Sequence, residues 1–261
     1  MQSLCVDTKN RPLKRCFMLG FRGAQSARFP IPPLSQAAFL LNFDGTLVED
    51  TAPGDPVVLP PGLVDMLRRL RAACGDALAI VSSRTVEQLD EFLGDVPFAV
   101  GGEGGIALRH RPGGPIERTA LPELPKVWLV QARDLVGTLP GVRLEHTEGG
   151  FILHYRAAPE AAQTLHAAAA AWARESAGAY LLVAGRMAWE IRPAGVDKGY
   201  AVSLLMQRPP FLGRKPVVIG NDTSDESAMA VAKAAGGAGF RIPVDFPTPA
   251  VLRTWLAGLT A

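Results

Sequence analysis

The sequence predicts an α/β fold in which a parallel sheet is interrupted by a small α+β lobe, called here the cap. Short apolar runs alternate with helical segments from residue 37 to residue 100, and the alternation resumes after residue 198. Between these regions the pattern changes to paired strands around one alanine-rich helix. Strands that alternate with helices are typical of a parallel sheet. A chain of 261 residues has room for one such core and a smaller inserted lobe.

These patterns divide the chain into a basic leader at 1–33, a core formed by 34–109 and 191–261, and a cap at 110–190. Residues 1–28 carry a net charge of +5, whereas the remaining chain carries −3. The proline-rich segment 30–33 resists both helix and strand. We expect the leader to be a disordered extension, with a targeting or interaction arm as the alternative.

The first half of the core shows three apolar runs that read as buried parallel strands, each ending in a turn or polar cluster. Two amphipathic helices separate them, and Thr85 is the expected N-cap of the second. In chain order the expected elements are a strand at 37–43, a helix at 62–74, a strand at 77–81, a helix at 86–93 and a strand at 98–100.

The cap and the second half of the core are read in the same way. The expected cap elements are strands at 142–144 and 151–155, a helix at 159–176, and strands at 180–183 and 187–191. The expected core elements that follow are a helix at 199–206, a strand at 216–219, a helix that ends near 235 and a strand at 239–242.

Composition and charge exclude several classes of function. Hydrophobic residues make up 48% of the chain, enough for a proper core, and the net charge of +2 argues against nucleic acid as the main partner. No apolar run reaches the roughly 18–20 residues that a membrane span needs. Three cysteines are too few for a disulfide framework and indicate a reducing compartment. We therefore expect a cytoplasmic, monomeric protein with no membrane or nucleic-acid partner.

Polar clusters follow three of the expected strands, at 42–46 (NFDGT), 82–84 (SSR) and 220–225 (GNDTSD). Ligands of an open parallel sheet bind outside the carboxyl ends of its strands, so these clusters should share one crevice. Lys198, at the start of a helix after the cap, is placed to reach it. Each cluster alone has a simpler explanation as a turn, a helix cap or a solvated lysine. Their joint occurrence at strand ends favours a common site.

The residue types in this crevice suit a phosphate with Mg²⁺. Asp44, Asp222 and Asp225 offer the hard oxygen ligands that Mg²⁺ prefers. Lys198 would offset the charge of a phosphoryl group, and Ser82 would donate a hydrogen bond to one of its oxygens.

The order of these motifs resembles the four motifs of the haloacid dehalogenase superfamily, and within it the trehalose-6-phosphate phosphatases. The resemblance covers about 36–245 and implies a Rossmann-like hydrolase core of the haloacid dehalogenase type with an inserted α+β cap. The segments that carry it are 42–47 (NFDGTL), 81–84 (VSSR), 153–156 (LHYR), 190–193 (EIRP), 196–199 (VDKG) and 220–226 (GNDTSDE).

The chain departs from the family pattern at two important positions. Asn42 stands where the family has the aspartate nucleophile, and a carboxamide cannot readily form an aspartyl-phosphate. Asn221 stands where the family has an aspartate ligand of Mg²⁺. Milder departures are Ser83 in place of a glycine, Gly104 in place of a histidine and Thr147 in place of a cap lysine.

The resemblance also implies roles for individual residues. Asp44 would act as general acid and then base, while Ser82 and Lys198 would hold the phosphoryl oxygens. The implied Mg²⁺ positions are Asn42, Asp44, Asn221, Asp222 and Asp225. The implied substrate-binding residues are Ser83, Arg84, Glu103, His154, Arg156, Glu190 and Arg192.

Some of these side chains have structural alternatives. His154 could be a satisfied structural histidine, Arg192 could brace the hinge before Pro193, and Trp189 is read as packing. The implied function is Mg²⁺-dependent hydrolysis of trehalose 6-phosphate through an aspartyl-phosphate, with Asn42 and Asn221 able to silence it. The alternatives are a non-catalytic sugar-phosphate-binding protein and a phosphatase of another sugar phosphate.

Overall fold

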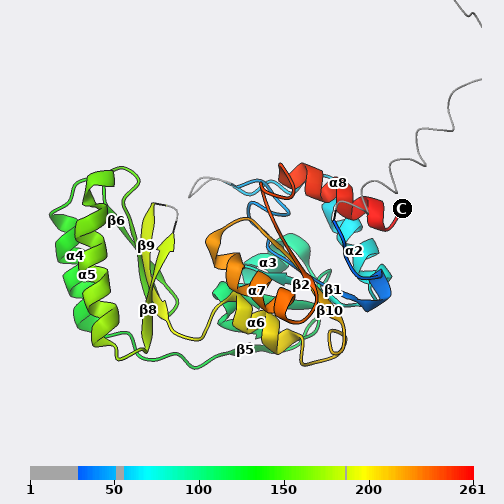
Figure 1. The fold of residues 1–261 in the computed structure, drawn as a ribbon, viewed down its shortest axis with the longest axis horizontal. Coiled ribbons are helices and arrows are strands. Elements are labelled where there is room, and N and C mark those ends of the chain that lie inside the picture. The colour runs from blue at the N-terminus through cyan, green and yellow to red at the C-terminus, as the bar shows by residue number, and fades with distance from the viewer. Residues whose placement is uncertain (1–28, 51–55, 186) are drawn as a thin grey trace, which may run out of the picture.

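The computed structural model describes residues 29–50, 56–185 and 187–261, which form two lobes (Figure 1). The larger lobe is a seven-stranded sheet with helices, and the smaller lobe is a four-stranded sheet with two helices. The α/β core with an inserted cap is therefore confirmed. Of the predicted leader, residues 1–28 lie outside the described part of the chain.

The core sheet has the strand order β11-β10-β1-β2-β3-β4-β5. The five strands from β11 to β3 are parallel, and β4 and β5 pair in antiparallel fashion at one edge. Their bounds are β1 Ala37–Leu41, β2 Leu78–Val81, β3 Ala99–Gly102, β4 Ala107–Arg109, β5 Ile116–Arg118, β10 Lys215–Gly220 and β11 Ala238–Arg241.

The apolar composition of the central strands matches their burial in the sheet. All five residues of β1 are buried, because β1 pairs with β10 on one side and β2 on the other while helices cover both faces. Helix α6 packs on α7, and α2 packs on α8. The core helices are α2 Leu63–Ala73, α3 Val86–Leu93, α6 Lys198–Leu205, α7 Glu226–Ala234 and α8 Pro249–Leu259.

Helix α3 begins as the sequence predicts. The Thr85 hydroxyl accepts a hydrogen bond from the Gln88 amide, and the Gln88 side chain accepts one from the Thr85 amide. This capping box satisfies two of the amide groups that a helix leaves free at its start.

The cap is an antiparallel sheet of order β6-β7-β9-β8. Its helices α4 and α5 lie on the face of the sheet that is turned away from the core (Figure 1). It has its own hydrophobic cluster, whose large members include Trp128, Phe151, Leu165, Trp172 and Ile191. The cap elements are α4 Lys126–Gly137, β6 Arg143–Thr147, β7 Gly150–His154, α5 Ala162–Glu175, β8 Tyr180–Gly185 and β9 Ala188–Pro193.

The structure differs from the sequence reading in several elements. Helices α4 and α8 and strand β4 were not predicted. Strand β5 lies in the range 110–190 that the sequence assigned to the cap, yet it pairs with β4 in the core sheet. The chain therefore leaves the core after Arg118, and it returns at Pro193, the last residue of β9.

Described residues of the predicted leader contact the core before position 34. The Phe29 ring stacks on Phe246 at a centroid distance of 4.4 Å and lies edge-on to Phe240 and Trp255. Within the described residues, no helix combines the length and the apolar character that crossing a membrane requires.

Candidate active site

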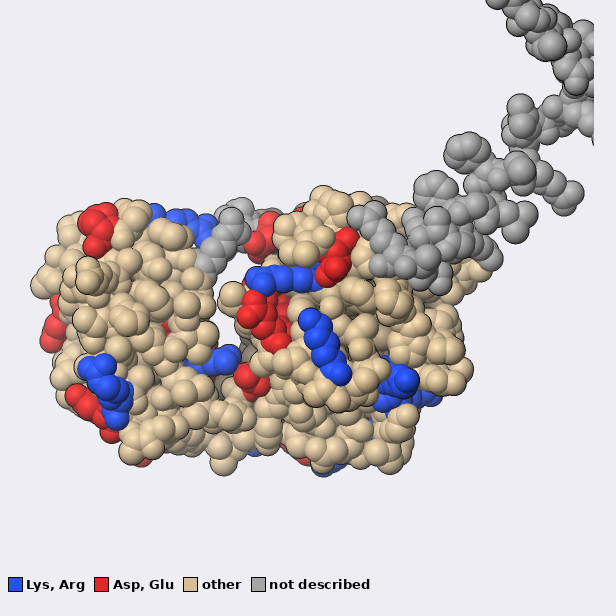
Figure 2. All heavy atoms as spheres, in the orientation of Figure 1, with Lys and Arg blue, Asp and Glu red and all other residues tan. Residues whose placement is uncertain are grey.

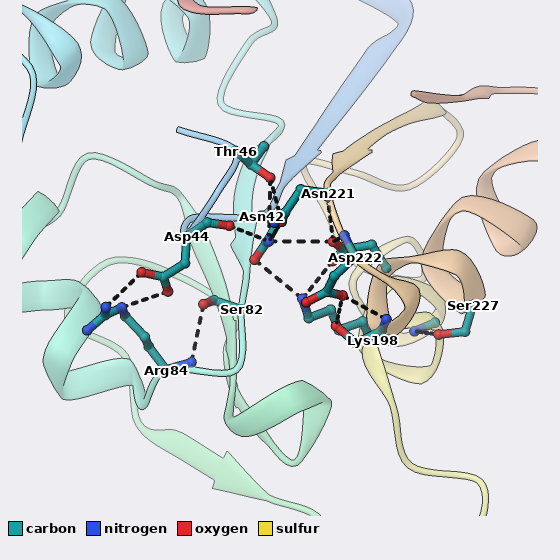
Figure 3. Close-up of polar contacts among 12 residues, drawn as sticks. Asn42, Asp44, Thr46, Ser82, Arg84, Lys198, Asn221, Asp222 and Ser227 are labelled. Atoms are coloured by element: carbon teal, nitrogen blue, oxygen red, sulfur yellow. Dashed lines mark hydrogen bonds and ion pairs between the residues drawn. The ribbon is translucent and has the colours of Figure 1, made fainter. Parts of the chain in front are cut away.

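Four chain segments meet at the carboxyl edge of the parallel strands (Figure 3). Asn42 follows β1, Ser82 follows β2, Asn221 follows β10, and Lys198 begins α6. The Nδ2 atom of Asn42 lies 2.8 Å from Oδ1 of Asn221, and Lys198 Nζ lies 3.3 Å from Oδ1 of Asn42. Parallel strands end at the same edge of a sheet, which is why polar residues so distant in sequence meet here.

Asn42 is at the centre of this group and is 5% exposed. Its Nδ2 donates to the main-chain oxygen of Asp44 at 2.9 Å and to Oδ1 of Asn221 at 2.8 Å. Longer contacts join Nδ2 to the Thr46 hydroxyl at 3.4 Å and to Oδ2 of Asp225 at 3.5 Å. The amide group thus faces four oxygen atoms.

Lys198 is buried at 2% exposure, and its ammonium donates to Oδ1 of Asp225 at 2.6 Å. Asp197 fixes the helix start, because its carboxylate accepts a hydrogen bond from the Tyr200 amide as the N-cap of α6. The main-chain oxygen of Asp197 lies so near Gly105 that a side chain there would clash with it. The side chain of Lys198 is therefore held by Asp225, and its main chain is held by the capped start of α6.

Asp225 accepts hydrogen bonds at its second oxygen from the amides of Asn221 and Asp222, at 2.9 and 3.2 Å. Asp222 is exposed, and its own carboxylate caps the following turn by accepting from the amide and hydroxyl of Ser224. Of these two aspartates, only Asp225 contacts Asn42 and Lys198.

Asp44 is turned away from this group (Figure 3). Both of its carboxylate oxygens accept hydrogen bonds of 2.7 Å from the guanidinium of Arg84. The guanidinium also lies over the rings of Phe43 and Phe92, at 5.7 and 5.4 Å from their centroids. Ser82 is fully buried, and its hydroxyl accepts a hydrogen bond from the Arg84 amide.

A crevice of about 700 Å³ is lined by core and cap residues and borders this group at Lys198 and Asp222. Figure 2 shows the hollow between the lobes, with acidic and basic side chains along its core side. Of the predicted site residues, those that line the crevice are Ser83, Glu103, Glu190, Arg192, Lys198 and Asp222.

Three predicted substrate residues do not line the crevice, and one of them, Arg84, is instead bound to Asp44. His154 pairs with Glu145 at 2.6 Å and lies opposite Ala188, whereas the chain re-enters the core at the other end of β9. Arg156 is exposed in the turn beyond β7. Neither His154 nor Arg156 lines the crevice. The register of β7 against β9 places His154 opposite the first residue of β9, whereas the chain returns to the core at the last residue of that strand.

The two other structural alternatives have clear outcomes. Arg192 lines the crevice and also lies 3.6 Å from the carboxylate of Asp197, so it connects the cap to the start of α6. Trp189 packs against His166 and donates to the main-chain oxygen of Ala162, as expected of a packing residue.

Residues of the site that the sequence does not predict include Thr46, Arg118, Glu145, His146 and Glu148. Thr46 is fully buried and donates to Oδ1 of Asn221 at 3.2 Å. Its place in the same motif as Asn42 was the available signal. Arg118 lines the crevice and pairs with Glu103 at 2.8 Å, but nothing near it in sequence marks it. Glu148, in the turn between two cap strands, also lines the crevice.

Burial raises the pKa of the Glu190 carboxyl in the crevice above its ordinary value. The nearby charge of Arg192 opposes this shift, while Asp222 and Glu145 add to it. Glu190 thus accepts a proton more readily than an exposed glutamate does.

Two of the three carboxylates that the sequence predicts for the metal are already engaged by cations of the chain itself. Arg84 holds Asp44, and Lys198 holds Asp225, which leaves the exposed Asp222. Across the ranges 29–50, 56–185 and 187–261, no group of three or more His, Cys, Asp or Glu side chains is arranged to hold a metal ion. The side chains as they lie therefore do not form a set of oxygen ligands that fits Mg²⁺.

The sequence model of the trehalose-phosphatase family matches residues 40–249. The trehalose-6-phosphate phosphatase of Escherichia coli (strain K12) is 34% identical over 238 residues, which cover 87% of this chain and 85% of that protein. A probable trehalose-phosphate phosphatase of Sinorhizobium fredii is 34% identical over 223 residues, or 84% and 82% of the two chains.

Solved structures show the same fold. The C-terminal domain of Candida albicans trehalose-6-phosphate phosphatase superposes with a TM-score of 0.70, at 16% identity over 92% of this chain and 96% of that one. The C-terminal domain of the Candida albicans trehalose synthase regulatory protein gives 0.60, at 14% identity over 92% and 98%.

Proposed function

Because the chain belongs to the trehalose-phosphatase family, we propose that its crevice is built for the dephosphorylation of trehalose 6-phosphate. The relatives are phosphatases, that is, phosphoric monoester hydrolases. In this proposal the chain binds the ester but turns it over slowly, because Asn42 replaces the nucleophile. The observation that carries it is Lys198, a buried lysine that lines the crevice and whose ammonium lies 3.3 Å from Oδ1 of Asn42.

The phosphate end of the ester would lie against the core. Lys198 supplies positive charge there, and the Ser82 hydroxyl lies at the neighbouring strand end. Asp44 is the proposed general acid and base. It has to leave Arg84 to face the ester, so Arg84 acts as the residue that sets its direction.

The sugar end would lie against the cap. Glu190 and Arg192 reach the crevice from β9, and Ser83 and Glu103 reach it from the core. Carboxylates, guanidinium groups and hydroxyls suit the hydroxyl groups of a disaccharide, because each can donate or accept hydrogen bonds. We propose these four residues as sugar contacts.

We propose Mg²⁺ as the cofactor for hydrolysis of trehalose 6-phosphate at a site with aspartates at positions 42 and 221. In this chain, however, the carboxylates of Asp44 and Asp225 are paired with Arg84 and Lys198, so the side chains as they lie do not hold the metal. Asn42→Asp adds one carboxylate, and Asn221→Asp adds a second.

The test is phosphate release from trehalose 6-phosphate with Mg²⁺ present. We expect Asn42→Asp to release phosphate several powers of ten faster than wild type, where each power of ten corresponds to about 1.4 kcal/mol of activation free energy. The double variant Asn42→Asp with Asn221→Asp should be faster still. Asn221→Asp alone is the matched control, because it adds a carboxylate without restoring the nucleophile.

Each other outcome has a definite meaning. A wild-type rate equal to that of Asn42→Asp contradicts the assignment of Asn42 to the nucleophile position. Binding of the ester with no turnover by any variant supports a non-catalytic sugar-phosphate-binding protein. Turnover of other sugar phosphates alone supports a different substrate.

We also propose that the chain acts as a monomer in the cytoplasm. The residues around the crevice come from both lobes of one chain, which supports a site complete in a single copy. Cys74 is a buried free thiol, as a reducing compartment maintains. Light scattering on the purified full chain and fractionation of the cell test these two points.

A further inference from the structure

We propose that the side-chain amide of Asn42 takes the place of a divalent cation at this site, so that the chain binds a sugar phosphate without metal. The inference rests on the proposed function only in that the crevice binds such an ester. It concerns a property of this chain's own residues and goes beyond the loss of the nucleophile.

The amide nitrogen of Asn42 is surrounded by oxygen atoms. Nδ2 of Asn42 is within 3.5 Å of the main-chain oxygen of Asp44, Oδ1 of Asn221, Oδ2 of Asp225 and the hydroxyl of Thr46. Oxygen atoms gathered around one point need a positive centre or a donor between them. Here the polarised N–H bonds of the amide supply it.

The hydrogen-bond partners of Asn42 determine the orientation of its amide group. Lys198 carries donors only, so the Asn42 atom that faces it must be the oxygen. The amide nitrogen is then directed at Asp44 and Asn221. The Asn42 nitrogen can only donate, so the Asn221 atom that faces it must be the oxygen, which also accepts a hydrogen bond from the Thr46 hydroxyl. The orientation of both amides follows from the hydrogen-bond network.

The charges that surround the Asn42 amide are balanced by the chain itself. Asp44 is neutralised by Arg84 and Asp225 by Lys198, and Asn42 and Asn221 carry no charge. Aspartates at positions 42 and 221 would add two negative charges, which a divalent cation would then have to balance. Replacing both by carboxamides removes those two charges, so the side chains in contact with Asn42 are balanced in charge without a metal.

The experiment measures the affinity of the full chain for trehalose 6-phosphate by calorimetry, once in EDTA and once in Mg²⁺. We expect the wild-type dissociation constants to agree within about twofold, because nothing at the site recruits the ion. We expect Asn42→Asp to bind at least about tenfold more weakly in EDTA than in Mg²⁺, since its new carboxylate faces other oxygens.

A second measurement needs no sugar. In EDTA, Asn42→Asp should melt at a lower temperature than wild type, because an oxygen replaces the amide nitrogen that donates to the four surrounding oxygens. Mg²⁺ should recover that loss for Asn42→Asp and leave the melting temperature of wild type unchanged. If Asn42→Asp does not fold in EDTA, recovery of folding by Mg²⁺ carries the same meaning.

Wild-type affinity that improves about tenfold or more with Mg²⁺, or a wild-type melting temperature that rises with Mg²⁺, overturns the inference. Failure of wild type to bind the ester under both conditions instead contradicts the proposed function. The melting measurement then still decides whether Asn42 replaces the cation.

Discussion

The guanidinium of Arg84 holds both carboxylate oxygens of Asp44, through Nε–Oδ2 and Nη2–Oδ1 hydrogen bonds of 2.7 Å each. Two parallel hydrogen bonds fix the direction of a carboxylate as well as its charge. The residue that resemblance marks as general acid and base is thus directed away from Lys198 by its own neighbour.

A double-mutant cycle measures this pairing. Arg84→Gln, Asp44→Asn and the double variant should show a coupling of about 1 kcal/mol in the free energy of unfolding by urea. Both side chains are about one quarter exposed, at 23% and 27%, which limits the value through solvent screening. The same cycle on the exposed pair Arg68 and Asp65 should give less. Equal coupling in both cycles would contradict a directed contact.

Lys198→Met should lower the free energy of unfolding by about 3 kcal/mol, because it leaves the buried Asp225 carboxylate without its cation. Both side chains of this pair are only 3% exposed. Lys215→Met, at the exposed start of β10, is the matched control and should change stability little. Urea unfolding measures the loss of stability in both variants. Similar losses for Lys198→Met and Lys215→Met would contradict a stabilising role of Lys198 for the buried Asp225 carboxylate.

Gly105→Ala should destabilise the chain by about 3 kcal/mol or more, through a clash combined with backbone strain. A Cβ at Gly105 would lie 2.1 Å from the main-chain oxygen of Asp197, and the φ angle is +110°. Gly104→Ala has a positive φ of +66° but open space around it, so it should lose only about 1–2 kcal/mol. Thermal unfolding compares the two neighbours. Because Asp197 precedes Lys198, we also expect weaker binding of the ester by Gly105→Ala alone.

Glu190 gives a pH dependence of stability whose sign follows from its pKa. The folded state raises that pKa, so Glu190 contributes most below the unfolded value of about 4.3, and the contribution is lost as the pH rises through the folded value. Glu190→Gln should therefore gain stability relative to wild type as the pH rises from 4 towards neutrality.

Glu87 supplies the control of opposite sign. Its own backbone amide, together with Arg118, lowers the pKa of its carboxyl, so its contribution is present at neutral pH and lost on acidification. Glu87→Gln should lose stability relative to wild type as the pH rises. Urea unfolding over this pH range measures both slopes, and equal slopes would refute the assignment.

The sequence predicts the core strands and their polar ends well, for a physical reason. The run before Asn42 is apolar at every position because both faces of β1 are covered, and the polar residues begin where that cover ends. The meeting of Asn42, Lys198 and Asn221 then follows from parallel strands that share one edge.

What the sequence does not predict depends on contacts between distant residues. The direction of Arg84 is set by the rings of Phe43 and Phe92 and by Asp44, and no local pattern records that arrangement. His154 is placed by the register of β7 against β9, which periodicity alone does not specify. Strands β4 and β5 have three residues each, too short for an alternating pattern to stand out.

The cap closes around its own aromatic and aliphatic cluster, and two chain segments join it to the core, one after β5 and one before α6. Such a lobe is a module that can be exchanged as a unit. On the proposed function, a lineage can recombine this insertion and change which alcohol is accepted, while the surrounding sheet continues to hold the anionic end of the ester. Diversification of specificity and retention of the phosphate pocket are thereby separated along the chain.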